Sequence, residues 1–341
     1  RRDAARHGDR MSVERGSLGV TLAIAGPRYD DEVLALSRAL RQRGARVRVL
    51  DFTGLPGAHT LELRGEEPSY DGRALDDIDA LFIRRLRFHL DDEALAEAAR
   101  GSDEGWHGAL DRFIAATRVE REVGALIWSA LTLLDCPVVN ALEAQLVHPR
   151  KVHHLRTLAA AGVAVPPFVA TSDAGEAEAF ARSQPDGAVI KPLRGLLKSR
   201  LLEVGEPLPV AERPVLVQRY VPGSSVRVYV VGGAPAAAGI MRNAGAVDSS
   251  VEPTGVELTE LSEEERGAVT LAARAAGLPW SGVDLQRPRD GGPSQILECN
   301  AAPMFANFSR RTGARVPEAL ADYLIERARG GPAWTEQEER P

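Results

Sequence analysis

Two strand-like segments near the end of the chain, residues 280–286 and 296–300, constrain the fold more than any other part of the sequence. Both are rich in apolar residues, and the turn-forming stretch 288–293 (Pro-Arg-Asp-Gly-Gly-Pro) separates them. Two strands joined by such a turn form an antiparallel pair. The sequence therefore predicts an antiparallel sheet in this region.

These two strands carry three side chains with oxygen donors, Asp284, Glu298 and Asn300. Because residues two apart on a strand point to the same face, Glu298 and Asn300 should project together, while Leu297 and Cys299 point into an apolar layer. Carboxylate and amide oxygens are the ligands that Mg²⁺ prefers, with phosphates and waters in the remaining positions. The pattern predicts a metal site, although acidic residues at strand edges are also common without any ligand.

Composition and charge limit the classes of protein to which the chain can belong. With 341 residues, 44% of them hydrophobic, it can bury a sizeable core and is long enough for two or three domains. A net charge of −6 argues against a nucleic-acid partner, because nucleic-acid proteins normally show a basic excess. No apolar run reaches the length of a membrane span, so no membrane partner is expected. The only cysteines, Cys136 and Cys299, cannot form a disulfide framework, which favours the reducing cytoplasm.

The chain opens with a βαβ pattern. A strand pattern at 18–25 is followed by a helix pattern at 30–43 that Gly44 ends, and a second strand pattern lies at 47–52. This order implies a parallel sheet. It is not a dinucleotide-binding fingerprint, because Gly26 stands alone where a G-x-G-x-x-G motif is needed.

Further elements follow along the chain. Two more strands are expected at 60–64 and 76–85, with Asp71-Gly72 as the hairpin turn between them, and then a long helix at 113–134. The remaining expected elements are a helix ending at Gly162, strands at 188–192 and 215–221, a hairpin of 226–232 and 235–241 that turns at Gly232-Gly233, a helix from the Ser262/Glu265 capping box to Gly277, and a last helix at 315–329.

Six short motifs occur in a fixed order in the second half of the chain. They are Lys151 on a helix, Val189-Ile190-Lys191-Pro192, Val217-Gln218-Arg219-Tyr220-Val221, Ser225-Val226-Arg227, Asp284, and Glu298-Cys299-Asn300. Their order resembles that of the ATP-grasp ligases, and most closely the RimK-type branch that adds glutamate to a ribosomal protein. The likeness covers about residues 142–324, and the βαβ unit before it resembles the pre-ATP-grasp domain of the same superfamily.

The resemblance implies an α/β (α+β) chain with the ATP-grasp fold, in which two α+β subdomains sandwich the nucleotide beside an N-terminal βαβ domain. The implied division is a flexible extension at 1–17, a pre-ATP-grasp domain at 18–145, a small subdomain at 146–222, a large subdomain with the metal site at 223–329, and a tail at 330–341. It also implies ATP and two Mg²⁺ ions as cofactors, with Mn²⁺ as an alternative metal, and a homodimer as an expectation for the family.

The resemblance assigns the nucleotide phosphates to Lys151 and Lys191. A lysine ammonium is a compact positive charge that suits phosphate oxygens, and Lys191 lies in an apolar strand where it needs an anion. The alternative for both is a surface lysine whose stem lies along apolar surface. The other residues expected to contact the nucleotide are Gln218, Arg219, Tyr220 and Val221, as the hinge whose backbone pairs with adenine, and Ser225.

The sequence departs from the family at two places around the nucleotide. Ser224 and Ser225 offer only hydroxyls where the family often has an acidic residue for the ribose. The segment 193–200, after Lys191, contains a single glycine where the family has a glycine-rich flap. Backbone amides need glycine to approach phosphates closely, so the flap should bind phosphate differently here.

The resemblance assigns catalysis to Arg227, Arg242 and Lys191. In the family, arginines at such positions face the γ-phosphate and the acyl phosphate, which suit planar bidentate donors. A salt bridge to a nearby carboxylate is the alternative for both arginines. By the same resemblance, Glu298 would bridge two Mg²⁺ ions, with Asp284 on one and Asn300 on the other.

The implied activity is that of an ATP-dependent carboxylate–amine ligase. Phosphoryl transfer from ATP would make an acyl phosphate, and attack by an amine would then give an amide, ADP and phosphate. The expected substrate is an amino acid or peptide, and Arg85 and Arg87 at the end of a strand form a candidate patch for an acidic one. Two alternatives stay open: a macrocyclase that makes side-chain ester or amide cross-links in a ribosomal precursor peptide, and a nucleotide-binding module without catalysis.

Overall fold

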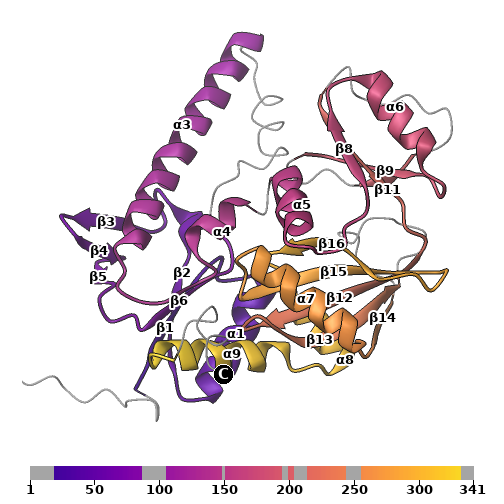
Figure 1. The fold of residues 1–341 in the computed structure, drawn as a ribbon. Helices are drawn as coiled ribbons and strands as arrows, with labels where there is room; N and C mark the ends of the chain where they lie inside the picture. Colours follow the sequence, from indigo (N-terminus) through magenta and orange to yellow (C-terminus); the bar gives the residue numbers. More distant parts are fainter. Residues whose placement is uncertain are drawn as a thin grey trace, which may run out of the picture.

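The computed structural model describes residues 19–86, 105–147, 150–193, 199–202, 213–242 and 255–331. In Figure 1 an N-terminal sheet lies beside a large antiparallel sheet, and a small antiparallel sheet with helix α6 lies beyond the large one. The chain therefore has the mixed α/β character that the sequence predicts.

The N-terminal sheet is parallel and has the strand order β2-β1-β6-β7. Its strands are β1 (Thr21–Ala25), β2 (Arg46–Leu50), β6 (Ala80–Ile83) and β7 (Val138–Val139). Helix α1 (Asp31–Gln42) packs on one face and helix α3 (Gly105–Thr132) on the other. Strands β1 and β6 are buried throughout, as expected for a parallel sheet that is covered on both faces.

The caps of α1 lie where the sequence predicts them. The Asp30 carboxylate accepts hydrogen bonds from the backbone N–H groups of Glu32 and Val33. After the C-cap, Gly44 adopts a φ of +79°, which glycine reaches without steric cost. The βαβ opening is confirmed.

The hairpin at Asp71-Gly72 exists, but it joins a different pair of strands from the one predicted. Both residues have positive φ, 50° and 71°, and they connect β4 (Glu67–Tyr70) to β5 (Arg73–Ala74). Strand β4 also pairs with β3 (Leu61–Arg64), beside the short 3₁₀ helix η1 (Phe52–Gly54). The prediction missed β4 because Glu-Glu-Pro-Ser-Tyr lacks an apolar alternation.

The small sheet is antiparallel, with the strand order β10-β9-β11-β8. Its strands are β8 (Phe168–Thr171), β9 (Ala188–Lys191), β10 (Arg200–Leu201) and β11 (Val215–Arg219). Helix α6 (Ala174–Ser183) covers one face with a small apolar core. Helix α4 (Leu142–Val147) and helix α5 (Lys151–Ala160) precede this sheet, and α5 lies between it and the large sheet (Figure 1).

The large sheet is also antiparallel, with the strand order β14-β13-β12-β15-β16. Its strands are β12 (Gly223–Val231), β13 (Ala234–Arg242), β14 (Gly255–Leu258), β15 (Trp280–Pro288) and β16 (Gln295–Asn300). The predicted pairing of the last two strands is confirmed, and so is the hairpin turn at Gly232-Gly233. Helix α7 (Glu263–Ala275), which begins with the predicted capping box at Ser262, covers one face.

The last two helices connect the large sheet to the N-terminal sheet. Helix α8 (Ala306–Thr312) and helix α9 (Val316–Ala328) share an apolar core with α1, β1 and β6. The predicted segment 223–329 thus contributes a helix to the sheet of segment 18–145, and the domain division as a whole stays a prediction. The predicted extension at 1–17 and all of the predicted tail beyond residue 331 lie outside the described residues.

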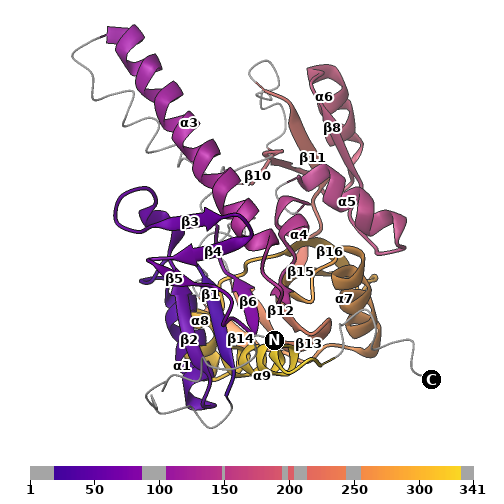
Figure 2. The same cartoon turned by 90° about the vertical axis from the view of Figure 1, so that its left-hand side faces the viewer.

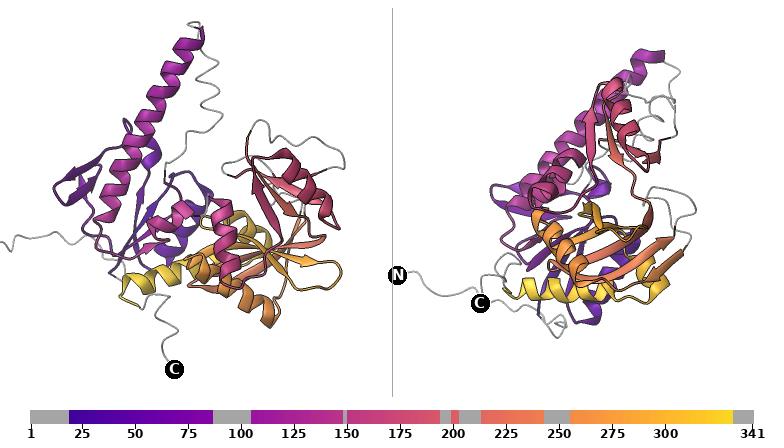
Figure 3. Two further views of the ribbon diagram at one scale, coloured as in Figure 1. Left: turned by 45° about the horizontal axis from the view of Figure 1, so that its top comes forward. Right: turned by 45° about the vertical axis from the view of Figure 1, so that its right-hand side comes forward.

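Helix α3 is the most extended element of the structure. It begins at Gly105 rather than at the predicted residue 113, and Figures 2 and 3 show it reaching well away from the sheets. In the described part of the chain, neither this helix nor any other has the length and apolar character of a membrane span.

Candidate active site

Three charged side chains stand in one row across the large sheet. Arg227 on β12 is the cross-strand partner of Asp284 on β15, and Asp284 is the partner of Glu298 on β16. Directly opposite residues in antiparallel strands share a face, so the row projects from one side of the sheet. The opposite side carries an apolar cluster that packs against α7.

Arg227 and Asp284 form a buried ion pair. Arg227 Nε donates to Asp284 Oδ1 at 2.5 Å and one terminal nitrogen donates to Oδ2 at 3.2 Å. Burial alone would lower the pKa of Arg227, but the charge and hydrogen bonds of Asp284 raise it, so the guanidinium stays charged. Gly282 leaves the room for this arrangement, because an added Cβ would lie 2.6 Å from Pro303 and 3.2 Å from Arg227.

The third predicted ligand lies on the same face. Asn300 is the cross-strand partner of Gly282, two residues along both strands from the Asp284–Glu298 pair. Its Oδ1 accepts the N–H of Ala302 at 2.9 Å, which fixes the orientation of the amide. The prediction that three oxygen donors share one surface is therefore confirmed, whereas their role as metal ligands stays a prediction.

The register shifts between Asp284 and Leu285, and this shift corrects the expected direction of Leu297. Leu285 pairs with Ile296, so Leu297 is the extra residue of a β-bulge. Leu297 lines the same pocket as Glu298 instead of entering the apolar layer. Cys299 does point into that layer, where burial raises the pKa of its thiol.

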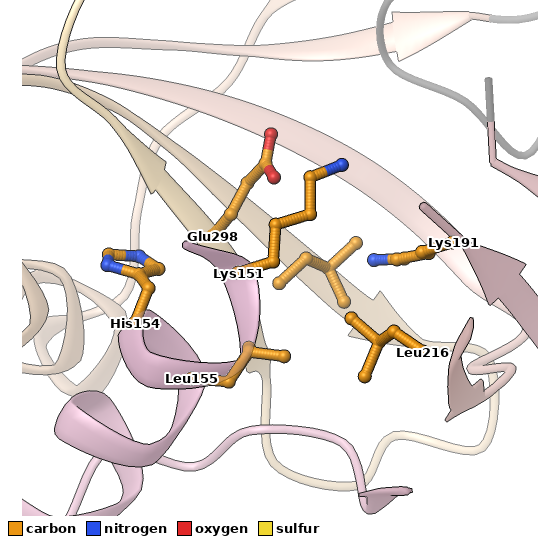
Figure 4. A pocket seen from close by; sticks show the side chains of 7 residues that line it. Lys151, His154, Leu155, Lys191, Leu216 and Glu298 are labelled. Atoms are coloured by element: carbon orange, nitrogen blue, oxygen red, sulfur yellow. The ribbon is translucent and has the colours of Figure 1, made fainter. Parts of the chain in front are cut away.

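The two predicted phosphate-binding lysines enter one pocket from different elements. The pocket lies between α5, β9, β11 and β16, and its lining residues are Lys151, His154, Leu155, Lys191, Leu216, Leu297 and Glu298. Figure 4 shows the ends of Lys151 and Glu298 close together, with Lys191 approaching from β9. The structure thus brings together two cations and one carboxylate that are far apart in the sequence.

His154 is a residue of this site to which the sequence assigned no functional role. It is fully buried on α5, and its Nε2 accepts the N–H of Cys299 at 2.9 Å. Strand β16 lies at the edge of the sheet, so this bond satisfies a backbone group that β15 does not reach. His154 therefore ties the helix that carries Lys151 to the strand that carries Glu298.

In the predicted adenine hinge, residues 218–221, several backbone groups form hydrogen bonds with other parts of the protein. The N–H of Arg219 donates to Pro167 and the N–H of Tyr220 donates to Gly187, both at 2.9 Å. The carbonyl of Val221 accepts from the side chain of Gln286 at 2.9 Å. Recognition of adenine by this segment stays a prediction. The backbone groups that would bind adenine are ones other than these three.

Side chains of the hinge region differ in their surroundings. Gln218 is buried, and its Nε2 has no hydrogen-bond partner within the described part of the chain. The Arg219 side chain approaches Asp186 at 3.4 Å. Ser225 is half-buried on β12 beside Gln286.

Arg242 lies apart from the row. It follows Ile240 by two residues on β13, and Ile240 pairs with Val226, so the strand alternation places Arg242 on the face opposite Arg227. It forms an exposed ion pair with Glu257 at 2.6 Å. The salt bridge that the sequence left open as an alternative is present, and the catalytic role of Arg242 stays a prediction.

Comparisons with known proteins agree with this architecture, although no family model matches the chain. A probable alpha-L-glutamate ligase 2 of Shewanella amazonensis is 32% identical over 120 residues, which are 32% of this chain and 38% of that protein. A probable alpha-L-glutamate ligase of Mannheimia succiniciproducens is 26% identical over 224 residues, which are 61% of this chain and 74% of the relative.

A solved structure matches along nearly the whole length. The ATP-grasp ligase PsnB, complexed with a phosphomimetic variant of minimal precursor, Mg and ADP, aligns with a TM-score of 0.73 and 26% identity over 91% of this chain and 99% of PsnB. The chain has the ATP-grasp fold. These relatives support an ATP-dependent ligase as the enzyme class, and ATP with Mg²⁺ as its cofactors.

The donor set on this face of the large sheet fits a hard cation. Asp284 and Glu298 supply carboxylates and Asn300 an amide oxygen from neighbouring positions on one face, and Mg²⁺ prefers such ligands. Among the described residues, no group of three or more His, Cys, Asp or Glu side chains is placed to hold a metal.

The predicted acceptor patch, Arg85 and Arg87, lies only partly within the described residues. Arg85 is exposed just after β6, whereas Arg87 and the centre of the predicted flap, residues 194–198, lie outside the described residues. The preceding residue, Arg84, is 4% exposed, and its guanidinium donates hydrogen bonds to Asp30, Glu32 and the carbonyl of Ala302. The sequence could not separate these neighbouring arginines, because Arg84 bonds α1 and the loop that follows β16, whereas Arg85 is exposed.

Proposed function

We propose that this ATP-grasp protein is a ligase that activates a carboxylate as an acyl phosphate and joins it to a nucleophile of a peptide or amino acid, with release of ADP and phosphate. The observation that carries the proposal is the Arg227–Asp284–Glu298 row, whose last member lines the pocket that Lys151 and Lys191 enter. Cations and carboxylates converging at one point suit a nucleotide's phosphates and their metal.

Each side chain has a distinct task in this proposal. Lys151 and Lys191 bind phosphate oxygens as point charges. Asp284 engages Nε and one terminal nitrogen of Arg227, so the other terminal nitrogen is the group that meets the transferred phosphoryl. Asp284, Glu298 and Asn300 hold Mg²⁺, which when bound neutralises the charge that develops during phosphoryl transfer. The second ion, the use of Mn²⁺ and a homodimer remain predictions.

A peptide is the substrate that the full-length match favours. PsnB aligns with this chain over 99% of its own length. A second PsnB structure, 25% identical to this chain, is complexed with minimal precursor. The glutamate ligase of Shewanella amazonensis, by contrast, is matched over 38% of its length. Formation of side-chain ester or amide cross-links in a precursor peptide is therefore the second candidate, beside addition of an amino acid.

A turnover screen tests the proposal. The protein is incubated with ATP, Mg²⁺ and candidate amino acids or peptides rich in Thr, Ser, Asp and Glu, and released phosphate, nucleotides and product masses are measured. We expect ADP with phosphate, and a peptide that loses the mass of one water for each cross-link or gains an amino acid residue. Formation of AMP with pyrophosphate would contradict acyl-phosphate chemistry, and MgADP binding without any turnover would favour a binding module.

A matched pair of variants locates the chemistry. Glu298→Gln keeps the size of the side chain but removes its charge, and turnover should fall about 100-fold or more, by analogy with the loss of one charge-stabilising group. Glu264→Gln makes the same change on the exposed side of α7 and should leave turnover unchanged. Equal turnover in both variants would mean that the row is not the phosphate end of the site.

A further inference from the structure

The ladder of β15 and β16 ends at Gly282 and Asn300, and a side chain from the N-terminal sheet lies just beyond it. Asn140 directly follows β7 and is completely buried. Its Nδ2 donates to the carbonyls of Trp280 and Ala301 at 2.8 and 2.9 Å, and its Oδ1 accepts the N–H of Trp280 at 3.1 Å. A single amide therefore determines how far the two strands diverge next to a predicted metal ligand.

Arg84, which follows β6, holds the next carbonyl of the same loop. One terminal nitrogen donates to the carbonyl of Ala302 at 2.8 Å, while Nε and the other terminal nitrogen bond Asp30 and Glu32 at 3.2 and 3.3 Å. Glu32 in turn accepts the N–H of Phe305 at 3.2 Å. The guanidinium is thus immobilised by two carboxylates of the α1 N-terminus and can act as a rigid support.

The supported peptide is the one that orients Asn300. Ala301 and Ala302 present their carbonyls to Asn140 and Arg84, and the N–H of Ala302 donates to Asn300 Oδ1. That oxygen is the atom through which Asn300 would bind a cation. A displacement of the Ala301–Ala302 peptide would therefore rotate or release the amide.

We propose that Arg84 and Asn140 are positioning residues for the metal site, acting through the Ala301–Ala302 peptide on Asn300. They follow β6 and β7 at the carboxyl ends of the parallel strands and bond the loop after β16, so they couple the N-terminal sheet to the metal end of the large sheet. The inference rests on the proposed function, because it takes Asn300 as a metal ligand. Outer partners that orient ligands typically change metal affinity 10- to 100-fold when altered.

The test measures metal binding directly. In Arg84→Lys the positive charge between Asp30 and Glu32 is kept, but one ammonium cannot reproduce the fork that also reaches Ala302. Free Mn²⁺ is followed by electron paramagnetic resonance in the presence of saturating ADP. We expect the Mn²⁺ dissociation constant to rise about 10- to 100-fold, while ADP affinity without divalent cation, measured by calorimetry, stays at the wild-type value.

A second variant and a control keep the test decisive if one protein folds poorly. Asn140→Ser removes the amide that donates to the carbonyls of Trp280 and Ala301, and it should likewise weaken Mn²⁺ binding. Asp322→Asn breaks the exposed ion pair between Arg43 and α9, a contact between the same two parts of the molecule that does not touch the loop. Its Mn²⁺ affinity should equal that of the wild type, and circular dichroism verifies the fold of every variant.

The possible failures have different meanings. Wild-type Mn²⁺ affinity in a folded Arg84→Lys or Asn140→Ser protein would overturn the positioning role and leave the proposed function intact. An equal loss of metal-free ADP binding would also overturn it, because the residues would then support the nucleotide cleft as a whole. A wild-type protein that binds no Mn²⁺ with ADP would overturn the proposed function and this inference together.

Discussion

Strand β15 carries an arginine–carboxylate pair on each of its faces, and the two pairs differ in what surrounds them. On the α7 face, Arg287 donates two hydrogen bonds to Glu265 at 2.7 and 2.8 Å. The same carboxylate accepts the hydroxyl of Ser294 at 2.8 Å and the N–H of Ser262 at 3.0 Å. Among the described residues, the partners of the Glu265 carboxylate are an opposite charge and hydrogen-bond donors, so this pair stabilises the start of α7.

On the other face, Arg227 pairs with Asp284, but Glu298 stands directly opposite Asp284 on the next strand. Like charges at opposite positions of neighbouring strands destabilise a sheet. Such a pair beside two lysines supports the proposed role in binding and chemistry, because sites of function are where stabilising rules are broken. The comparison teaches that the pair on the α7 face serves the fold, and it supports the proposal that the other face serves a ligand.

The largest expected effect comes from removing the positive charge of the Arg227–Asp284 pair. Arg227→Met leaves Asp284, which is 3% exposed, buried without its counter-charge, and should lower the free energy of unfolding by about 3 to 5 kcal/mol and abolish ATP turnover. Urea unfolding measures the loss, with the exposed Arg266→Met as control. A change below about 1 kcal/mol would mean that Asp284 is better hydrated than its burial indicates.

The structural pair should respond in stability alone. Glu265→Gln replaces charge-assisted hydrogen bonds to Arg287 by weaker ones, and the free energy of unfolding should fall by about 1.5 to 3 kcal/mol. Turnover should stay at the wild-type level, since Glu265 lies on the α7 face. Thermal unfolding measures the stability and phosphate release measures the turnover, each compared with Glu264→Gln. A loss of turnover without a loss of stability would contradict a purely structural role for Glu265.

Acid should weaken the same pair over a defined range of pH. The pKa of Glu265 is lowered from 4.5 to about 2, chiefly by the hydrogen bonds from Arg287, which outweigh the opposing effect of burial. Because the folded-state value is the lower one, this contribution is complete above pH 4.5 and is lost as the pH falls toward 2. Unfolding measured along this range should show a shallower loss in Glu265→Gln, and equal slopes would contradict the assignment.

The smallest effect on stability is expected at Glu298. Glu298→Gln removes the like charge opposite Asp284 and also weakens the attraction to the lysines of the pocket. The free energy of unfolding without ligands should change by less than about 1 kcal/mol, although turnover is lost. Thermal unfolding in the absence of nucleotide and metal measures it, and a loss as large as that of Arg227→Met would make Glu298 a structural residue instead.

Local signals in the sequence were sufficient for most of the fold. The capping box at Ser262, the two glycines at 232 and 233, and the turn between β15 and β16 each act over a few residues, and the structure confirms all three. The shared face of Asp284, Glu298 and Asn300 followed from strand alternation. Strand β4 and the bulge at Leu297 were missed, because a short polar strand and a register shift exist only in relation to a partner strand.

By itself, the sequence determined the antiparallel pair, its three oxygen donors and the order of charged residues that indicates the ATP-grasp fold. Only the tertiary structure decided what supports those donors. His154, Arg84 and Asn140 lie 145, 218 and 161 residues from the backbone groups that they bind. No local pattern encodes such contacts, because an isolated histidine, arginine or asparagine acquires its partner only when separate sheets pack together and bury unpaired backbone groups.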